Sequence, residues 1–176
     1  MNTGKILLDE NSTPYSALDS YNVAVCRPTP FIGGTANARG DKDGTDVSHT
    51  LFTVTGDVLV RIYGVVTTTL VGAGTIEVGV TGNTAGLIAQ VANATDLATG
   101  DFYYAATSAK VGATLLSDIL GPYIITNGLD ILEKVGTADI TAGNIYYVCL
   151  WRPIASWVDA AGAETKANVV AAGTQI

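Results

Sequence analysis

The chain has 176 residues and a formal net charge of −7, and only 14% of its residues are charged, against about 25% in an average soluble domain. This length is sufficient for one domain whose core needs no metal or disulfide to fold. The nine Lys and Arg residues are scattered, which excludes the clustered basic surface that non-specific nucleic-acid binding and binding to anionic membranes require.

The first 46 residues combine a polar start, one strand pattern and a long loop. Residues 1–20 are polar around the short apolar run Ile6-Leu7-Leu8 and are expected to form an arm or a short strand. They show no secretory signal, and no apolar run approaches the ~20 residues of a membrane span, so a soluble protein made in a cytoplasm is expected. YNVAVCRP at 21–28 alternates as a strand does, and residues 29–46, dense in Gly, Asp, Asn and Thr, predict a long surface loop.

Residues 47–157 are rich in β-branched residues, which indicates that they form the folded core. The longest pattern, DVLVRIYGVVTTTLV at 57–71, predicts a strand of about 13 residues, long against the usual five or six. Every second residue starting from Val58 lies on one face of this strand. That face is apolar and is expected to face the core. The other face carries Arg61 and Tyr63 and is expected to meet water or a partner. A bulge or bend is expected near Gly64.

The remaining patterns are short strands between turns, at 101–109, 121–128, 129–136 and 144–153. TNG at 126–128 predicts a hairpin, and residues 92–99 are expected to form a single helical turn. Residues 158–176 hold few bulky apolar side chains and predict a flexible or partner-ordered tail. Short strands at this spacing predict an all-β fold, a β-sandwich of jelly-roll type with an extended N-terminal arm and a C-terminal tail.

Neither the cysteines nor the histidine make a recognisable catalytic or metal site. Cys26 and Cys149 are far apart in the chain and are expected to be reduced core residues. The only histidine, His49, follows the loop and precedes a strand, where an ordinary polar residue is expected. No Ser-His-Asp set and no zinc ligand set can be assembled around it. The sequence therefore predicts a protein that is not an enzyme and needs no cofactor.

One loop segment, DKDGTD at 41–46, is a weak candidate for a Ca²⁺ site. Asp41, Asp43 and Asp46 supply oxygen atoms close together, as this ion prefers. The segment lacks both the spacing of an EF-hand loop and its bidentate Glu, so a solvated turn is the favoured interpretation. The overlapping tripeptide RGD at 39–41 matches an integrin-binding motif, but three residues recur too often by chance to indicate a function.

Aromatic and acidic residues suggest two further kinds of site. Tyr103 and Tyr147 belong to adjacent tyrosine pairs that can serve a sugar-stacking platform, although core or subunit contacts are favoured because one member of each pair must point inward. A polysaccharide hydrolase would use a pair of carboxylates. The sequence does not show whether any two of its candidates face each other: Asp57, Glu77, Asp101, Asp130 and Glu133.

Three segments carry a resemblance to a known family: HTLFTVTG, EVGVTGNTAGLIAQ and GLDILEKVGTADITAGNIYYVCLWRP. In this order they resemble a family of small structural proteins of tailed phages and prophages. The similarity covers roughly residues 47–155 and consists of glycines, threonines and core aliphatics. It implies a virion protein that decorates or cements the major capsid protein lattice on the outer surface of the head.

The low charge is compatible with that role, because an exterior with so few ionised groups is expected to be covered in part by other subunits. A homotrimer in contact with the major capsid protein is therefore expected, with Arg61, Tyr63, Tyr103 and Tyr147 as interface candidates. Two alternatives remain open: a tail- or head-fibre module that recognises host glycans through exposed aromatics, and a shell protein built as a jelly roll.

Overall fold

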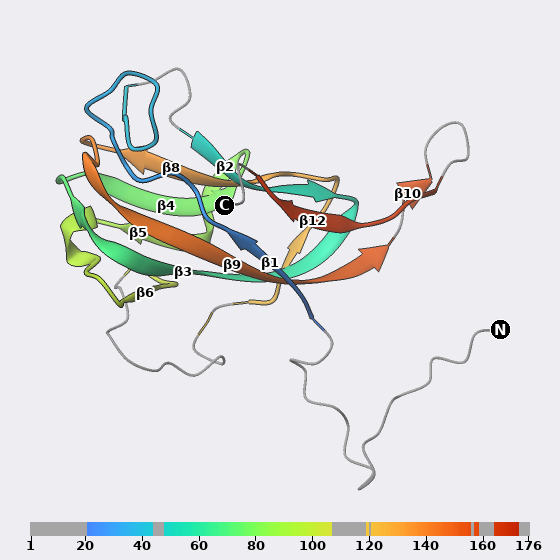
Figure 1. Cartoon of the computed structure of the whole chain (residues 1–176). Helices are drawn as coiled ribbons and strands as arrows, with labels where there is room; N and C mark the ends of the chain where they lie inside the picture. The colour runs from blue at the N-terminus through green and yellow to red at the C-terminus, as the bar shows by residue number, and fades with distance from the viewer. Residues whose placement is uncertain are drawn as a thin grey trace, which may run out of the picture.

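The computed structural model describes residues 21–43, 48–106, 119, 121–155, 157–158 and 164–172. In this part of the chain the fold is all-β, with two five-stranded antiparallel sheets stacked on each other (Figure 1). The all-β prediction is confirmed, and the two sheets are consistent with a β-sandwich. None of the described segments is a helix long and apolar enough to cross a membrane.

The first sheet has the strand order β1-β9-β3-β6, and β7 also pairs with β3. Its centre is the long pair β3 and β9, which runs from Asp57 opposite Ala155 to Val71 opposite Ala142. The strands of this sheet are Asn22–Cys26 (β1), Asp57–Val71 (β3), Phe102–Tyr103 (β6), Tyr123–Ile125 (β7) and Ala142–Ala155 (β9).

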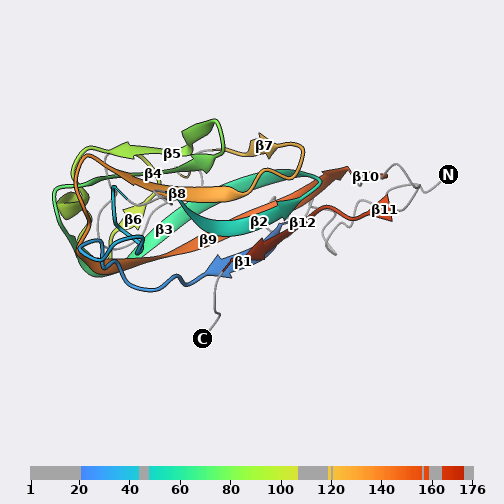
Figure 2. The same ribbon diagram turned by 90° about the horizontal axis from the view of Figure 1, so that it is seen from above.

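The second sheet has the strand order β12-β2-β8-β4-β5. Its strands are Ser48–Thr55 (β2), Thr75–Val80 (β4), Asn83–Val91 (β5), Ile131–Gly136 (β8) and Asn168–Ala171 (β12). Two short strands, Trp157–Val158 (β10) and Glu164–Thr165 (β11), form a separate ribbon. Figure 2 shows β1 and β12 along one long side of the sandwich, with β5 and β7 along the other.

The strands pair in a nested order. β4 pairs with β8, β3 with β9, and β2 with β12, so each pair encloses the preceding one along the chain. This nesting explains why the predicted hairpin at 126–128 is wrong. Asn127 and Gly128 do have the positive φ angles of a tight turn, 61° and 64°, but the strands on either side of the turn lie in different sheets, β7 on β3 and β8 between β2 and β4.

The core lies between the two sheets, and β3 shows its pattern most clearly. Val58, Val60 and Ile62 are buried, whereas Arg61 and Tyr63 are half-exposed on the opposite face. The division of this strand into two faces was predicted correctly, because alternation along a strand is a local property. The strand spans 15 residues.

The expected irregularity near Gly64 is displaced. Pairing of β3 with β9 is regular through Gly64, and the register shifts instead between Asp57 and Val58 and again after Val66. Gly64 has a packing role, because a methyl group at this position would lie 2.7 Å from Cγ2 of Ile145 and 3.1 Å from a ring carbon of Tyr147. Because Gly64 has no side chain, the Ile145 and Tyr147 side chains fit against it, and β3 stays in regular register with β9 at this position.

The two ends of the chain differ in how well they were predicted. The early strand at 21–28 is confirmed as β1, and the helical turn at 92–99 is confirmed as the 3-10 turn Ala94–Asp96. The arm at 1–20 lies outside the described residues. The tail at 158–176 is not loose throughout: β12 within it pairs with β2, and Val169 is buried in the core.

Candidate functional site

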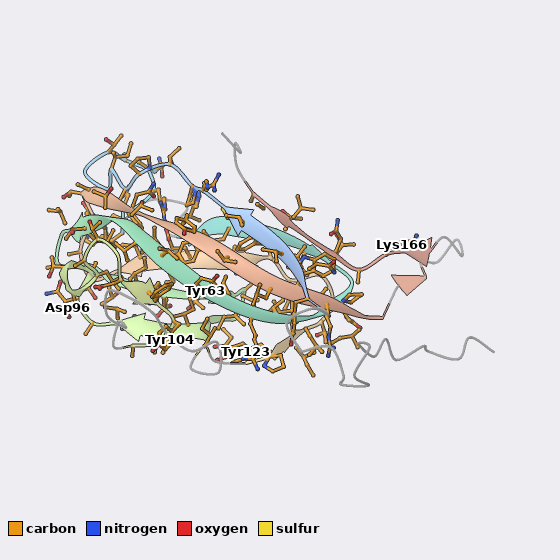
Figure 3. All side chains as sticks on the ribbon, turned by 60° about the horizontal axis from the view of Figure 1, so that its bottom comes forward. Tyr63, Asp96, Tyr104, Tyr123 and Lys166 are labelled. Carbon is orange, nitrogen blue, oxygen red and sulfur yellow. The ribbon has the colours of Figure 1, made fainter. Side chains whose placement is uncertain are left out.

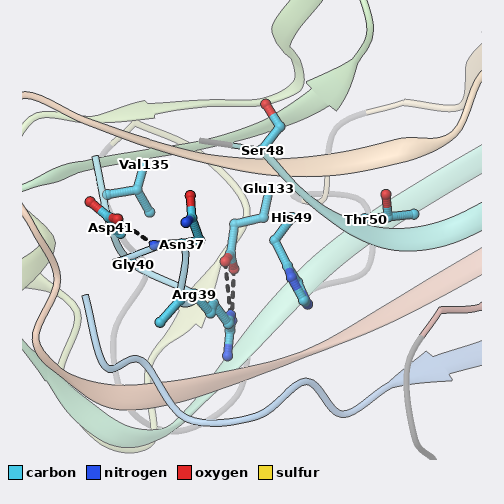
Figure 4. Close-up of a pocket in the computed structure, with 10 residues that line it drawn as sticks. Asn37, Arg39, Gly40, Asp41, Ser48, His49, Thr50, Glu133 and Val135 are labelled. Carbon is cyan, nitrogen blue, oxygen red and sulfur yellow. Dashed lines mark hydrogen bonds and ion pairs between the residues drawn. The ribbon is translucent and has the colours of Figure 1, made fainter. Parts of the chain in front are cut away.

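The loop between β1 and β2 carries a buried arginine that pairs with a buried glutamate. Arg39 donates from Nε to Oε1 of Glu133 at 2.9 Å and from Nη2 to Oε2 at 2.7 Å (Figure 4). Both side chains are only 1% exposed. Glu133 belongs to β8 in the second sheet, so this ion pair fastens the loop to that sheet.

The other donors of Arg39 reach the loop and the first sheet. Nη1 donates to the carbonyl oxygen of Thr29 at 2.7 Å and to Oδ1 of Asn144 at 2.8 Å, and Nη2 donates to the carbonyl oxygen of Ile145 at 3.3 Å. All five N–H groups of the guanidinium therefore have an acceptor, which is the condition for burying this charge. The guanidinium carbon also lies 3.8 Å from the centre of the Phe31 ring. We call Arg39, Glu133 and their partners the Arg39 clamp.

Tyr147 completes the clamp from β9. Its hydroxyl donates to Oε2 of Glu133 at 2.6 Å, and its ring meets Tyr103 edge-on with the ring centres 6.5 Å apart. The Tyr103 hydroxyl donates to the carbonyl oxygen of Ile76 at 2.9 Å. Burial raises the pKa of both tyrosines well above the ordinary value. Both rings are fully buried, so the expectation that Tyr103 and Tyr147 serve as surface contacts or a glycan platform is wrong for this chain.

The charge on Glu133 is maintained by its partners. Burial on its own raises the pKa of this carboxyl, but the Arg39 guanidinium and the Tyr147 hydroxyl outweigh that effect and hold the pKa below its ordinary value. The carboxylate form is therefore the folded form at neutral pH, as an ion pair requires. The clamp joins the loop, β8 and β9 through charged and neutral hydrogen bonds in the middle of an apolar core.

A polar cavity of about 320 Å³ lies between this loop and β2 (Figure 4). His49 lines it and stands directly opposite Glu133 in the pairing of β2 with β8. Much of the remaining lining belongs to the clamp and its loop, including Arg39 and Asp41, whose polar atoms are occupied by hydrogen bonds within the protein. Within the described segments no three His, Cys, Asp or Glu residues are grouped to hold a metal ion.

In the described part of the weak Ca²⁺ candidate, the Asp41 carboxylate accepts hydrogen bonds from backbone amides, as in a turn. Oδ2 of Asp41 accepts from the amide of Asn37 at 2.7 Å, and Oδ1 accepts from the amide of Asp43 at 2.9 Å. Asp43 forms an exposed ion pair with Lys42, and Asp46 lies outside the described residues. These contacts agree with the favoured interpretation of a turn. Because the Arg39 side chain is buried, the RGD tripeptide is not presented for binding.

Five carboxylates were candidates for a hydrolase pair, and two of them lie on adjacent strands. Glu77 of β4 stands opposite Lys134 of β8, so Glu133, one position away, points to the other side of the sheet. Glu77 accepts hydrogen bonds from Thr84 and Gln90 on its own side. The other three each accept a backbone N–H: Asp57, Asp101 and Asp130.

The remaining interface candidates lie on the outer face of the first sheet, formed by the side chains of β1, β9 and β3 that point away from the second sheet. Tyr63 is half-buried with its ring centre 6.2 Å from that of Phe102, and burial raises its pKa (Figure 3). Arg61 donates to the carbonyl oxygen of Ile119 at 3.1 Å. Tyr103 and Tyr147 point to the opposite side, so the four predicted contact residues do not form one site.

This outer face carries mostly aliphatic and aromatic side chains, but its centre is not open to solvent: Val148 and Leu150 are only 9% and 8% exposed. Arg61 and Arg152 are its charged side chains between positions 59 and 65 of β3 and 146 and 152 of β9, and no carboxylate points outward there. At its two edges Val23 is 62% and Ile124 67% exposed. The aliphatic side chains of the three strands on this face are Val23, Val25, Leu59, Val65, Val148 and Leu150.

The outer face of the second sheet is different in character. Thr53 and Thr55 of β2 point outward, and Glu77 and Lys134 approach to 3.9 Å across β4 and β8. Water-facing sheets usually show this kind of polar surface. This face is more polar than that of the first sheet, but Val170 on its edge strand β12 is 53% exposed, so each sheet exposes aliphatic side chains.

Both cysteines are buried free thiols, as predicted. They belong to β1 and β9, and each is paired with a different residue of the partner strand, Cys26 with Tyr147 and Cys149 with Ala24. Burial raises the pKa of Cys26 to about 11 and that of Cys149 to about 12. Both thiols are thus held in the unreactive protonated form.

The Arg39 clamp was not predicted from the sequence. One signal was present: Glu133 stands in ILEKVG between Ile131 and Val135, on the alternate positions that face the core. A charged residue on an apolar face requires a buried partner, but the sequence does not show that the partner is an arginine 94 positions away.

Comparisons with protein-family models, with curated proteins and with solved structures find no match to this chain.

Proposed function

We propose that this protein is a capsid decoration, or cement, protein of a tailed phage, bound to the outer surface of the head through the major capsid protein and sister copies. The observation that carries the proposal is the low charge of the chain, 14% of its residues, together with large aliphatic side chains exposed on both sheets: Val23, Ile124 and Val170. An exterior with so few ionised groups is expected to be covered in part by other subunits.

The resemblance to phage structural proteins supports the same role. Its motifs coincide with the framework of the sandwich: the segment at 77–90 runs from β4 through the turn into β5, and the segment at 128–153 includes β8 and most of β9. Gly82 and Gly143 in these motifs have φ angles of 86° and 105°, which an L-residue adopts only with strain. The motif glycines therefore specify the fold of such a protein and not a catalytic site.

The nested strand pairs support the jelly-roll interpretation, since a long hairpin rolled onto two sheets pairs its strands in this order. The Arg39 clamp is suited to the same role, because it locks both sheets and a long loop together without a metal or disulfide. A decoration protein adds stability to a shell only if its own fold is rigid.

A reconstitution experiment tests the proposal. Virions of the phage that encodes the chain are prepared with the coding sequence deleted, and purified protein is added back. Saturable binding to closed heads and a higher temperature of DNA release are expected. Failure to bind these heads contradicts the decoration role, and failure of the deletion phage to form closed heads indicates the shell-protein alternative instead.

A glycan-binding module remains a second candidate, because two tyrosines at the first sheet are half-exposed. These are Tyr63 and Tyr104, whereas Tyr123 packs against the core (Figure 3), and stacking on sugars needs accessible rings. Binding of the purified protein to a glycan array that is lost in Tyr63→Ala would favour this candidate. Tyr103→Ala does not test this candidate, because the Tyr103 ring is in the core.

A further inference from the structure

A small groove lies on the side of the sandwich where β5 and β7 run, opposite the side of β1 and β12 (Figure 2). Its volume is about 160 Å³, and Ile124, one of its lining residues, is 67% exposed. Asn83 and Thr126 are polar residues of the lining. The rest of the lining is mostly aliphatic or aromatic: Val80, Leu87, Tyr123, Ile124, Ile125 and Leu129.

The two strands that flank this groove are edge strands. Within the described residues, β5 pairs only with β4, and β7 pairs only with β3. Each strand therefore has one edge whose backbone N–H and C=O groups have no described strand partner. An extended segment can pair with such an edge while its side chains fill a neighbouring pocket. The groove therefore fits an extended aliphatic segment.

The described chain begins within reach of the groove. The ring of Tyr21 lies beside Arg152, with its centre 5.3 Å from the guanidinium carbon. Arg152 pairs with Leu59, and Leu59 pairs with Ile124, so these residues form one row across the first sheet. At the usual strand spacing, this row spans about 14 Å from β1 to β7. The 12 residues at 9–20 can extend over about 40 Å.

We propose that Ile6-Leu7-Leu8 occupies this groove on its own chain. Within residues 1–20 it is the one run of three consecutive aliphatic residues, with Lys5 before it and Asp9 after it. A tether of this length holds the run at an effective concentration in the millimolar range, so a weak contact is sufficient. The contact covers Ile124 and the edges of β5 and β7, which otherwise remain open to pairing with other chains. The inference goes beyond the proposed function and does not depend on it.

Hydrogen exchange of the purified full chain, followed by NMR, tests whether the run is bound. The amides of Leu7 and Leu8 are expected to exchange about tenfold or more slowly than in a synthetic peptide of residues 1–20, because binding buries them and pairs their backbone. Exchange at the rate of the peptide overturns the inference. Neither result bears on binding to phage heads, which reconstitution measures separately.

Matched substitutions locate the contact. Ile124→Asp places a carboxylate at the groove, and Leu7→Asp places one in the run, so each is expected to bring exchange at Leu8 to within about twofold of the peptide. Val170→Asp and Ser12→Asp are the controls: Val170 is 53% exposed on the opposite side of the sandwich, and Ser12 lies in the polar part of the same segment. Slow exchange that persists in Ile124→Asp, or is lost equally in Val170→Asp, overturns the assignment of the groove. Circular dichroism checks that the variants fold.

Nuclear Overhauser effects between methyl groups identify the occupant. A contact between Leu7 and Ile125 is expected in uniformly labelled protein. It should be absent from a mixture in which labelled Leu and labelled Ile are on different copies, because the contact is within one chain. Contacts of Ile125 with Leu115 or Leu116 in place of Leu7 overturn the choice of Ile6-Leu7-Leu8. A cross-peak between Leu7 and Ile125 in the mixture overturns binding on the same chain.

Discussion

At the scale of single residues, the Arg39 clamp is the most consequential feature of the molecule. Its energetic role follows from burial: an ion pair in a core contributes little compared with an apolar substitute, but half of a pair is strongly destabilising. The five donors of Arg39 and the three bonds to the Glu133 carboxylate leave no part of this pair unsatisfied. Substitutions should therefore show strong coupling.

Removing one partner of the clamp should lower the free energy of unfolding more than removing both charges. Arg39→Met is expected to lower the free energy of unfolding by about 3–5 kcal/mol, because Glu133 would be left charged and buried. The double variant Arg39→Met, Glu133→Gln should recover a large part of that loss. Urea unfolding followed by fluorescence measures both. Lys42→Met, which removes an exposed ion pair, is the control and should leave stability unchanged. Additive effects of the two clamp substitutions would contradict this account.

The clamp should also contribute to acid denaturation. The pKa of Glu133 is lower in the folded protein than its ordinary value of 4.5, so the unfolded chain binds a proton first as the pH falls. The contribution of Glu133 is thus fully present above about pH 5 and is lost as the pH falls below 4.5 toward the folded pKa. Urea unfolding from pH 7 to pH 3 should show a shallower acid loss in Glu133→Gln. A wild-type slope in that variant would contradict the assignment.

The two thiols provide a further test at this scale. Because burial raises the pKa of Cys26 to about 11 and that of Cys149 to about 12, neither should react with a thiol reagent at pH 8 in the folded protein. Both should react within minutes in denaturant. Rapid native labelling of either cysteine would show that its strand, β1 or β9, opens easily.

At the scale of elements, substitutions in β12 test whether this part of the C-terminal tail is held in the fold. Val169 is buried and Val170 exposed on the same short strand. Val169→Asp is expected to destabilise the fold by about 3 kcal/mol or more, because it places a carboxylate in the core. Val170→Asp should change stability by about 0.5 kcal/mol or less. Urea midpoints measure the difference, and equal midpoints would mean that β12 does not hold the sheet.

Elements also show what the sequence can and cannot predict. The two faces of β3 follow from alternation, so residues such as Val60 and Arg61 were assigned to their sides correctly. The turn at Asn127 was recognised as a turn, but its partners were not, because sheet membership depends on strands distant in sequence. β12 was missed because NVVA is short and lies in a small-residue segment. The clamp was missed because Arg39 and Glu133 meet only in the folded chain.

At the scale of the whole molecule, the sandwich exposes large aliphatic side chains on both sheets, Val23 and Ile124 on the first and Val170 on the second. Under the proposed decoration role other subunits cover them, and the net charge of −7 suits the exterior of a shell whose interior holds DNA.

An electron-microscopy map of the intact virion tests this account most directly. The account predicts the two-sheet sandwich on the outside of the head, in contact with the major capsid protein and with sister copies. Density for this chain on a tail fibre or inside the head, or the absence of its density from the head, would contradict it.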